Sequence, residues 1–210
     1  MELEKKLVEY VVDSRFEDLS EEPLDIMKNT GLRVIGTTIA GATEEGCREL
    51  LDLVRGWGGK EESTILVHGG KVPAHNAALI NSVMARALDF DDVQPGCRSG
   101  NHVGAQSVPV ALAIAELCGG CSGKEFLTAL VLGTEVSARI HFASDYDGFD
   151  ATGSTGIFAS TAIAGKLLGL NQDQMLNALA LAFNRAAGSN QSITESTLAV
   201  RLVEGFSAQC

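Results

Sequence analysis

Three aspartates and one histidine are the residues of this sequence whose types and spacing could do chemistry. Asp89, Asp91 and Asp92 end an apolar segment, and His102 follows across a polar, glycine-containing stretch. Clustered carboxylates can bind a cation, or they can raise the pKa of one member so that it transfers protons. The alternative is a solvated acidic helix end, although carboxylates at a helix C-terminus oppose the helix dipole. These residues alone leave both interpretations open.

Two other motifs have simpler explanations. Cys118 and Cys121 have the CxxC spacing of a redox pair or of half a zinc site. No second ligand pair completes a metal site and no βαβ pattern precedes them, so we interpret them as part of a turn. Residues 153–156, Gly-Ser-Thr-Gly, could offer backbone N–H groups to an anion, but such a run before a helix is more often an N-cap.

The composition excludes several classes of partner. The chain has 210 residues, 45% of them apolar, and a formal net charge of −11, which fits one ordinary core or at most two small ones. No Lys/Arg run exceeds Lys5-Lys6, so we expect neither nucleic acid nor an anionic membrane as a partner. No signal peptide or membrane-spanning window is visible, and the five cysteines are an odd number. We therefore expect a cytoplasmic protein with reduced thiols.

Few aromatic residues and many glycines favour closely packed helices over a β-sandwich. Periodicity and capping signals predict helices over 3–11, 20–40, 43–57, 74–90, 105–118, 122–142, 155–168 and 171–187. Residues 63–73 read as a short β-hairpin, and 91–104 as a loop long enough to be functional. The apolar stretches 108–117 and 127–136 must be buried among helices or at a subunit interface. The expected fold class is all-α, a multi-helix bundle with at most one short β-hairpin.

Five blocks of the sequence resemble, in order and spacing, the MmgE/PrpD family. They are NSVMARALDFDD (81–92), VPVALAIAE (108–116), SGKEFLTALVLGTEVSAR (122–139), TGSTGIFASTAIAGKLLGL (152–170) and RLVEGFSA (201–208). The family includes 2-methylcitrate dehydratase, cis-aconitate decarboxylase and iminodisuccinate epimerase. The resemblance implies a helical first domain that forms the homodimer contact, followed by an α/β domain that closes over the active site. Residues 1–210 would be that helical domain, incomplete relative to the family and without the α/β lid.

The resemblance also implies a chemistry. Family members abstract a proton next to a carboxylate without a cofactor or metal, and then lose water, lose carbon dioxide or reprotonate the opposite face. By position, Asp89 matches the active-site aspartate of the family and His102 the histidine across the loop. We expect both to be catalytic, with His102 moving the proton while Asp89 orients it.

Several positions depart from the family pattern. Val93 stands where decarboxylase-like members have threonine, and Arg86 and Asp150 each replace a histidine. Val200 replaces a lysine, although Arg201 remains beside it. Replacing an imidazole and an ammonium group removes proton donors and anion ligands, which argues against decarboxylation of cis-aconitate.

The expected function is that of a lyase or isomerase acting on a small carboxylate or acyl compound, with a dehydratase as the first expectation. Arg86, Arg201 and Asp150 are the candidate substrate-binding residues, and Arg98 is a further possible source of positive charge. Each arginine could equally lie on the surface. The alternative function is a non-catalytic helical dimerisation module, or a subunit whose partner chain supplies the lid.

Overall fold

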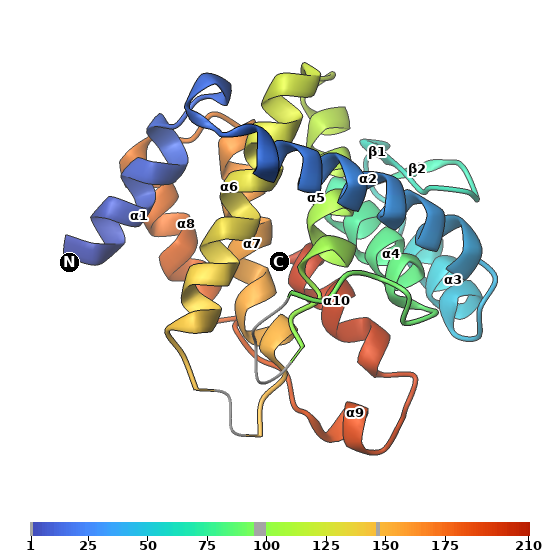
Figure 1. Cartoon of the computed structure of the whole chain (residues 1–210). Coiled ribbons are helices and arrows are strands. Elements are labelled where there is room, and N and C mark those ends of the chain that lie inside the picture. Colours follow the sequence, from blue (N-terminus) through green and yellow to red (C-terminus); the bar gives the residue numbers. More distant parts are fainter. Residues whose placement is uncertain (1, 95–99, 146–147) are drawn as a thin grey trace.

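The structure is a computed structural model that describes residues 2–94, 100–145 and 148–210. Figure 1 shows an arrangement built almost entirely of helices. In chain order the described elements are α1 (Glu2–Asp13), η1 (Phe16–Asp18), α2 (Glu21–Gly41), α3 (Cys47–Trp57), β1 (Ser63–Thr64), β2 (Lys71–Val72), α4 (Ala74–Arg86), α5 (Val103–Leu117), α6 (Gly123–Phe142), α7 (Ala151–Leu167), α8 (Gln172–Phe183), α9 (Gln191–Thr194) and α10 (Val200–Gln209). The predicted all-α class is confirmed. The predicted hairpin is also present, with Ser63 opposite Val72 in an antiparallel pair.

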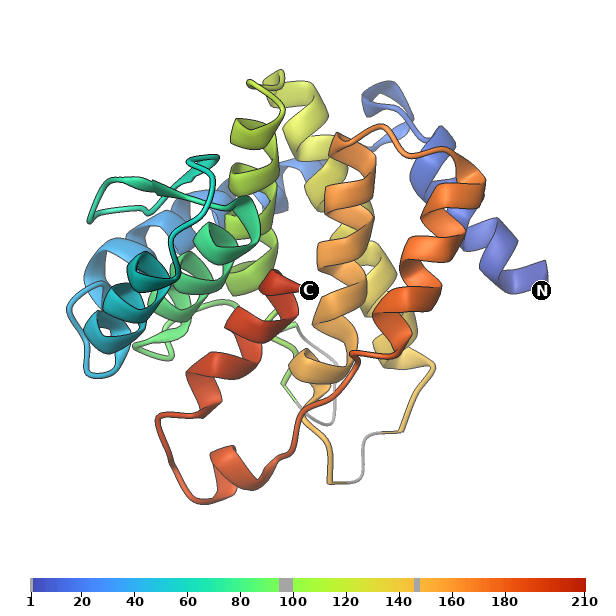
Figure 2. The ribbon, with the colours of Figure 1, turned by 180° about the vertical axis from the view of Figure 1, so that it is seen from behind.

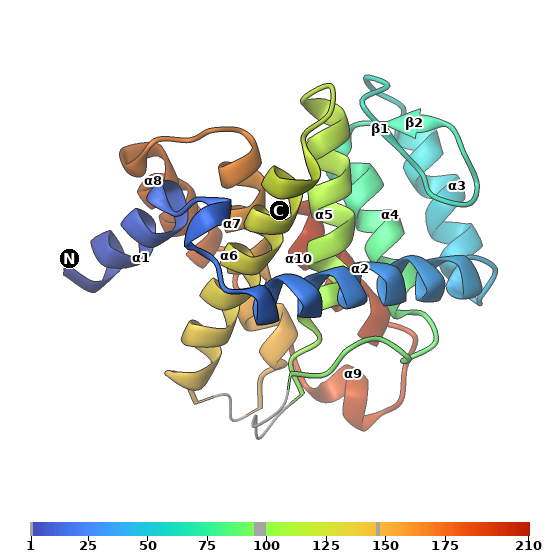
Figure 3. The ribbon, with the colours of Figure 1, turned by 45° about the horizontal axis from the view of Figure 1, so that its top comes forward.

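The central layer consists of α4, α5, α6, α7 and α10. Helix α7 packs against α5, α6 and α10, while α4 packs against α5 and α10. Seen from behind, α8 lies beside α7 with α1 at its outer side (Figure 2). Helix α2 crosses over α6, α5 and α4 toward α3, as Figure 3 shows. Each central helix is thus enclosed on several sides, as the nearly continuous apolar stretches require.

Small residues bring the central helices close together. Gly133 of α6 faces Ile163 and the backbone carbonyl of Ala159 on α7, and a Cβ at residue 133 would lie 2.8 Å from that carbonyl oxygen. Leu130 and Leu132 beside it are fully buried, and so is Val108 on α5. The stretches 108–117 and 127–136 are therefore buried largely by helices of the same chain. A homodimer contact remains a prediction.

Local capping signals set several helix starts. Ser122 and Glu125 form the predicted capping box of α6, since the Ser122 hydroxyl accepts from the Glu125 N–H and the Glu125 carboxylate accepts from the Ser122 N–H. Asn171 and Gln174 do the same for α8. Within the described residues, no helix is both long enough and apolar enough to cross a membrane.

Other predicted boundaries were wrong. Helix α4 ends at Arg86 rather than near residue 90, and Asp89 adopts a left-handed backbone with φ of 57° that interrupts the helical path. Helix α7 begins at Ala151 instead of Thr155, because the Asp150 carboxylate caps it by accepting from the Gly153 N–H. Residues 153–156 thus lie inside the first turns of α7.

Three further boundaries differ from the prediction. Helix α3 begins at Cys47 rather than Thr43, and α8 ends at Phe183 rather than Ala187. Helix α5 begins at Val103, inside the predicted loop. Helices α9 and α10 were not predicted at all, although α10 lies against α4, α5 and α7.

Candidate active site

A pocket of about 890 Å³ collects the predicted site residues. Its lining residues come from the end of α4 and the segment after it, from the starts of α5 and α7, and from α9 and α10 (the elements are labelled in Figure 1). All five catalytic and substrate-binding candidates from the sequence line it: Arg86, Asp89, His102, Asp150 and Arg201. Arg98 lies outside the described residues. Residues from four separate parts of the chain are therefore brought to one cavity.

Arg86 contacts three carboxyl groups at this pocket. It is the last residue of α4, and its side chain is only 7% exposed. Its Nη1 donates to Oδ1 of Asp89 and lies 3.1 Å from Oδ1 of Asp91, and its Nε lies 3.6 Å from Oε1 of Glu204. Burial alone would lower the pKa of Arg86, but the carboxylates of Asp91 and Glu204 outweigh it and raise that pKa. Arg86 is thus already engaged with protein carboxylates.

Asp91, and not Asp89, is the carboxylate paired with the histidine. Oδ2 of Asp91 lies 3.2 Å from Nδ1 of His102, and the Asp91 side chain is fully buried. The angles are not those of a hydrogen bond, so the contact is an ion-pair distance between two facing atoms. The Asp89 side chain is 75% exposed and turns to Arg86. The orienting role of Asp89 stays a prediction, and Asp91 is a second candidate for it because its carboxylate lies next to the His102 ring.

His102 is held by the ends of two helices. It is the N-cap residue of α5, and its backbone N–H donates to Oγ1 of Thr152 on α7 at 3.0 Å. Nδ1 lies 3.2 Å from Oδ2 of Asp91, and the other ring nitrogen faces the loop: a Cβ added at Gly100 would lie 3.3 Å from Nε2. Gly100 lines the pocket and carries no side chain to cover the ring. One ring nitrogen of His102 thus lies next to Asp91, and the other lies at the pocket.

Glu204 is a site residue that sequence reasoning missed. It lies on α10, lines the pocket and is 1% exposed. Burial raises its pKa well above the ordinary value, and the nearby carboxylate of Asp91 adds to this effect. Among the described residues, its Oε2 has no hydrogen-bond partner. A lone acid next to Gly205, in a helix whose other residues are mostly apolar or small, was the available signal.

Asp92 belongs to the same acidic group. Its Oδ2 accepts from the Gly104 N–H at 3.2 Å, and Gly104 leaves no room for a Cβ against that carboxylate. Burial raises the pKa of Asp92, and the charge of Asp91 adds to the shift. The end of α4 therefore carries buried charge as well as a solvated acidic surface.

Asp150 and Arg201 line the pocket, and each side chain also forms a hydrogen bond with the backbone of another residue. Oδ1 of the buried Asp150 accepts from the Gly153 N–H at 3.0 Å as the cap of α7. Nη1 of Arg201 donates to the backbone carbonyl of Glu45, in the connection between α2 and α3. Of the two described arginines at the pocket, Arg201 has no carboxylate partner within the described part of the chain, which makes it the more available cation.

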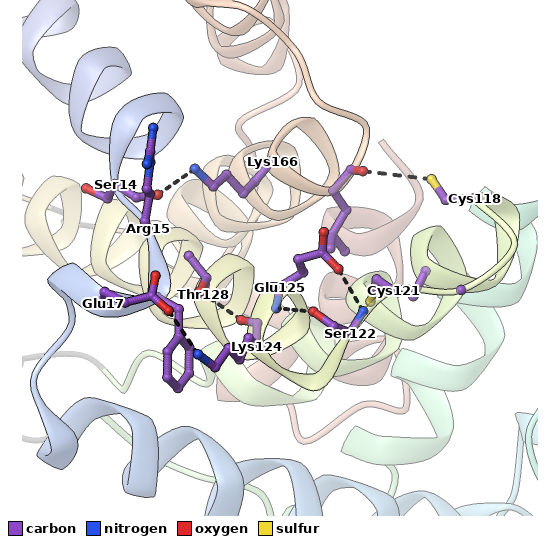
Figure 4. A pocket seen from close by; sticks show the side chains of 14 residues that line it. Ser14, Arg15, Glu17, Cys118, Cys121, Ser122, Lys124, Glu125, Thr128 and Lys166 are labelled. Atoms are coloured by element: carbon purple, nitrogen blue, oxygen red, sulfur yellow. Dashed lines mark hydrogen bonds and ion pairs between the residues drawn. The ribbon is translucent and has the colours of Figure 1, made fainter.

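A second pocket, of about 540 Å³, lies where α7 ends (Figure 4). Cys118 and Cys121 line it, both free and exposed, in a turn whose Gly119 has φ of 80°. Lys166 donates to the carbonyls of Val12 and Ser14 at 2.7 Å, which ties α7 to the end of α1. Burial lowers the pKa of Lys166. Both cysteines lie in the connection between α5 and α6, where the turn was predicted.

Residues 5–210 match the model of the MmgE/PrpD N-terminal domain. The chain belongs to the MmgE/PrpD family. The helices and the pocket described above are thus the N-terminal domain of an MmgE/PrpD protein, and the resemblance seen in five sequence blocks is confirmed.

Known proteins of the family that are similar to this chain are lyases by name. Human cis-aconitate decarboxylase is 32% identical over 124 residues, covering 55% of this chain and 25% of the human protein. Cis-aconitate decarboxylase of Aspergillus terreus is 28% identical over 154 residues, covering 69% and 31%. The 2-methylcitrate dehydratase of Cupriavidus necator is 25% identical over 204 residues, covering 84% and 38%. The chain therefore spans less than half the length of these relatives.

Proposed function

We propose that this MmgE/PrpD domain carries the acid/base centre of a lyase that dehydrates a small hydroxycarboxylate. The single observation that supports this best is the pairing of the buried Asp91 with His102 at a pocket. A buried carboxylate beside one ring nitrogen favours the tautomer with the proton on that nitrogen, and the other nitrogen can then accept a proton. This is the arrangement that proton abstraction next to a carboxylate needs.

In the proposed reaction, Nε2 of His102 removes a proton from the carbon next to a substrate carboxylate. The electron pair left on that carbon forms the double bond as the C–O bond on the neighbouring carbon breaks, and the leaving hydroxyl takes the proton from the His102 imidazolium and departs as water. Arg201 binds the substrate carboxylate, because the guanidinium of Arg86 is held by Asp89, Asp91 and Glu204. Asp89 lies exposed at the pocket, where it can contact the substrate hydroxyl.

The remaining parts of the proposal concern the assembly. We infer a cytoplasmic homodimer that uses no cofactor and binds neither nucleic acid nor membrane. A row of exposed apolar side chains on α2 supports a subunit contact: Leu32, Ile35 and Ile39 are spaced along one face of the helix. An α/β domain that closes the pocket, supplied by further chain or by a partner chain, completes the enzyme.

Solvent exchange is the most direct test, because it detects proton abstraction whatever step follows. The protein is incubated in deuterium oxide with 2-methylcitrate, citrate or cis-aconitate, and deuterium uptake next to the carboxylates is followed by NMR. His102→Gln should lose ~10²–10⁴-fold of the exchange rate, since glutamine keeps hydrogen-bonding capacity but cannot accept the proton. His75→Gln, at an exposed position on α4, is the matched control and should leave the rate unchanged. An unchanged rate in His102→Gln would contradict the proposal.

A second function has one observation in its favour. Carboxyl groups outnumber arginines in and next to the pocket. Arg86 contacts three of these carboxyl groups, those of Asp89, Asp91 and Glu204. A non-catalytic dimerisation module would tolerate such a site. In that case none of the substrates would exchange, while sedimentation would still show a dimer.

A further inference from the structure

Three possible metal ligands meet at the inner side of the pocket. Asp89, Asp91 and His102 each offer one ligand atom, and within the described part of the chain these atoms lie within 4.8 Å of one another. Oδ2 of Asp91 and Nδ1 of His102 are both buried and 3.2 Å apart, yet they form no hydrogen bond. Two atoms bonded to one ion at about 2.1 Å lie about 3 Å apart at ordinary coordination angles. The pair thus has the separation of two ligands on one ion.

We propose that Asp89, Asp91 and His102 bind a divalent transition-metal ion such as Mn²⁺ or Zn²⁺, and that the ion inhibits the chemistry of the pocket. Two carboxylates and an imidazole, without a thiolate, suit ions of this class. Asp91 is fully buried and directs its free Oδ2 toward the site, whereas Asp89 is exposed at the pocket. Asp89 therefore offers the route by which an ion from solvent enters.

The surroundings of the three residues support a cation. Arg86 contacts Oδ1 of Asp89 and Oδ1 of Asp91, which leaves the other oxygen of each carboxylate available. Carboxylates that bind a metal are commonly held by such outer hydrogen-bond donors. Among the described residues, Arg86 is the one arginine or lysine in contact with Asp89 and Asp91, so these two carboxylates outnumber it. A divalent ion would balance this excess.

The inhibitory effect follows from where the proton of His102 would lie. An ion bonded to Nδ1 displaces the proton from that nitrogen to water, and the neutral ring then carries its one proton on Nε2. Nε2 is the atom that accepts the substrate proton in the proposed function, so the ion and the reaction exclude each other. This consequence rests on the proposed function, whereas binding of the ion does not.

Binding is tested with Mn²⁺ alone, on the whole chain after treatment with a chelator. The electron paramagnetic resonance signal of free Mn²⁺ disappears on binding, and thiols such as Cys118 are poor ligands for this ion. We expect one site per chain, weakened more than ~10-fold in Asp89→Asn and in His102→Gln. The matched controls His75→Gln and Asp145→Asn change the same residue types at exposed positions and should bind as the unchanged protein does. Equal affinity in all five proteins would overturn the proposed site.

Asp89→Asn and His102→Gln are both used, so that misfolding of one variant does not leave the test undecided. Asp89 is exposed, so Asp89→Asn removes a ligand without disturbing the core. Circular dichroism checks that each variant keeps its helices. If both fold and still bind Mn²⁺ like the controls, the site is excluded.

Inhibition is tested separately, in a Cys118→Ser/Cys121→Ser background that removes the exposed thiols as Zn²⁺ ligands. Zn²⁺ should slow deuterium exchange of the substrate, and a chelator should restore it. Faster exchange with Zn²⁺ would overturn the inhibitory assignment. Mn²⁺ binding without any exchange in the metal-free protein would contradict the proposed function and leave the metal site standing, so the two failures are distinguishable.

Discussion

Oδ2 of the buried Asp91 faces Nδ1 of His102 at 3.2 Å, although the two residues are separated by the long loop before α5. The same carboxylate uses its other oxygen to contact Arg86 at the end of α4. Asp91 therefore links the cation at the end of one helix to the imidazole at the start of the next. Its substitution should affect both stability and proton transfer.

Asp91→Asn and Asp89→Asn should separate these two aspartates. Asp91→Asn leaves Arg86 with one buried charge fewer, and breaking such a buried pair costs ~3 kcal/mol of unfolding free energy. Asp89→Asn, at an exposed side chain, should cost less than about 1 kcal/mol. Urea unfolding followed by circular dichroism measures both values. Equal destabilisation by the two substitutions would show that Asp91 does not anchor Arg86.

The same pair also tests which carboxylate orients His102. Asp91→Asn should lower the rate of substrate proton exchange and change its pH profile, because the amide cannot stabilise the charged imidazole as the carboxylate does. Asp89→Asn should act mainly on the substrate KM if Asp89 contacts the substrate hydroxyl. Steady-state kinetics across pH 5–9 distinguish these outcomes. A pH profile altered by Asp89→Asn alone would return the orienting role to Asp89.

Asp150→Asn and Asp150→Ala distinguish a helix cap from a substrate ligand. Asparagine caps as well as aspartate, whereas alanine should cost ~1 kcal/mol because the Gly153 N–H loses its acceptor. If Asp150 acts only as a cap, Asp150→Asn leaves both Tm and substrate KM near the original values. A raised KM with unchanged Tm in Asp150→Asn would instead support substrate binding by this carboxylate.

The parts of the fold that sequence alone predicts are those set by neighbouring residues. Ser122 and Glu125 cap α6 through bonds three residues apart, so their pattern is visible in the sequence. The positions of Asp89 and His102 were likewise found from a motif and its spacing. Glu204 was missed because its burial depends on α10 packing against α4, where Gly205 lies against Leu79 and Val83. The contact between Asp91 and His102 was not predicted for the same reason, since it depends on how the chain turns after Arg86.

Gly133→Ala should destabilise the protein by ~1–3 kcal/mol, because the added methyl group meets Ile163 and lies 2.8 Å from the Ala159 carbonyl oxygen on α7. Gly56→Ala in α3 is the matched control. A Cβ at residue 56 has no neighbour within 4 Å in the described structure, so the better helix propensity of alanine should stabilise by up to about 1 kcal/mol. Urea unfolding of both variants tests the close approach of α6 and α7. Similar effects of the two substitutions would contradict that contact.

Glu204→Gln should change how stability depends on pH. Burial raises the folded-state pKa of Glu204 well above the ordinary value, so the folded protein keeps a proton that the unfolded chain releases above about pH 4.5. The folded state then binds more protons than the unfolded state, and the unfolding free energy falls as pH rises through this window. The slope contributed by this group is about 1.4 kcal/mol per pH unit.

Glutamine resembles the neutral carboxylic acid but does not titrate, so Glu204→Gln should lose this slope. Between pH 5 and pH 7 the unchanged protein should lose more stability than Glu204→Gln does, and the variant should be the more stable of the two at pH 7. Glu195→Gln, at an exposed position directly after α9, is the matched control and should keep the original slope. Urea unfolding at each pH measures the difference. Parallel curves for the unchanged protein and Glu204→Gln would mean that Glu204 is ionised in the folded state, with its charge balanced by Arg86 at 3.6 Å.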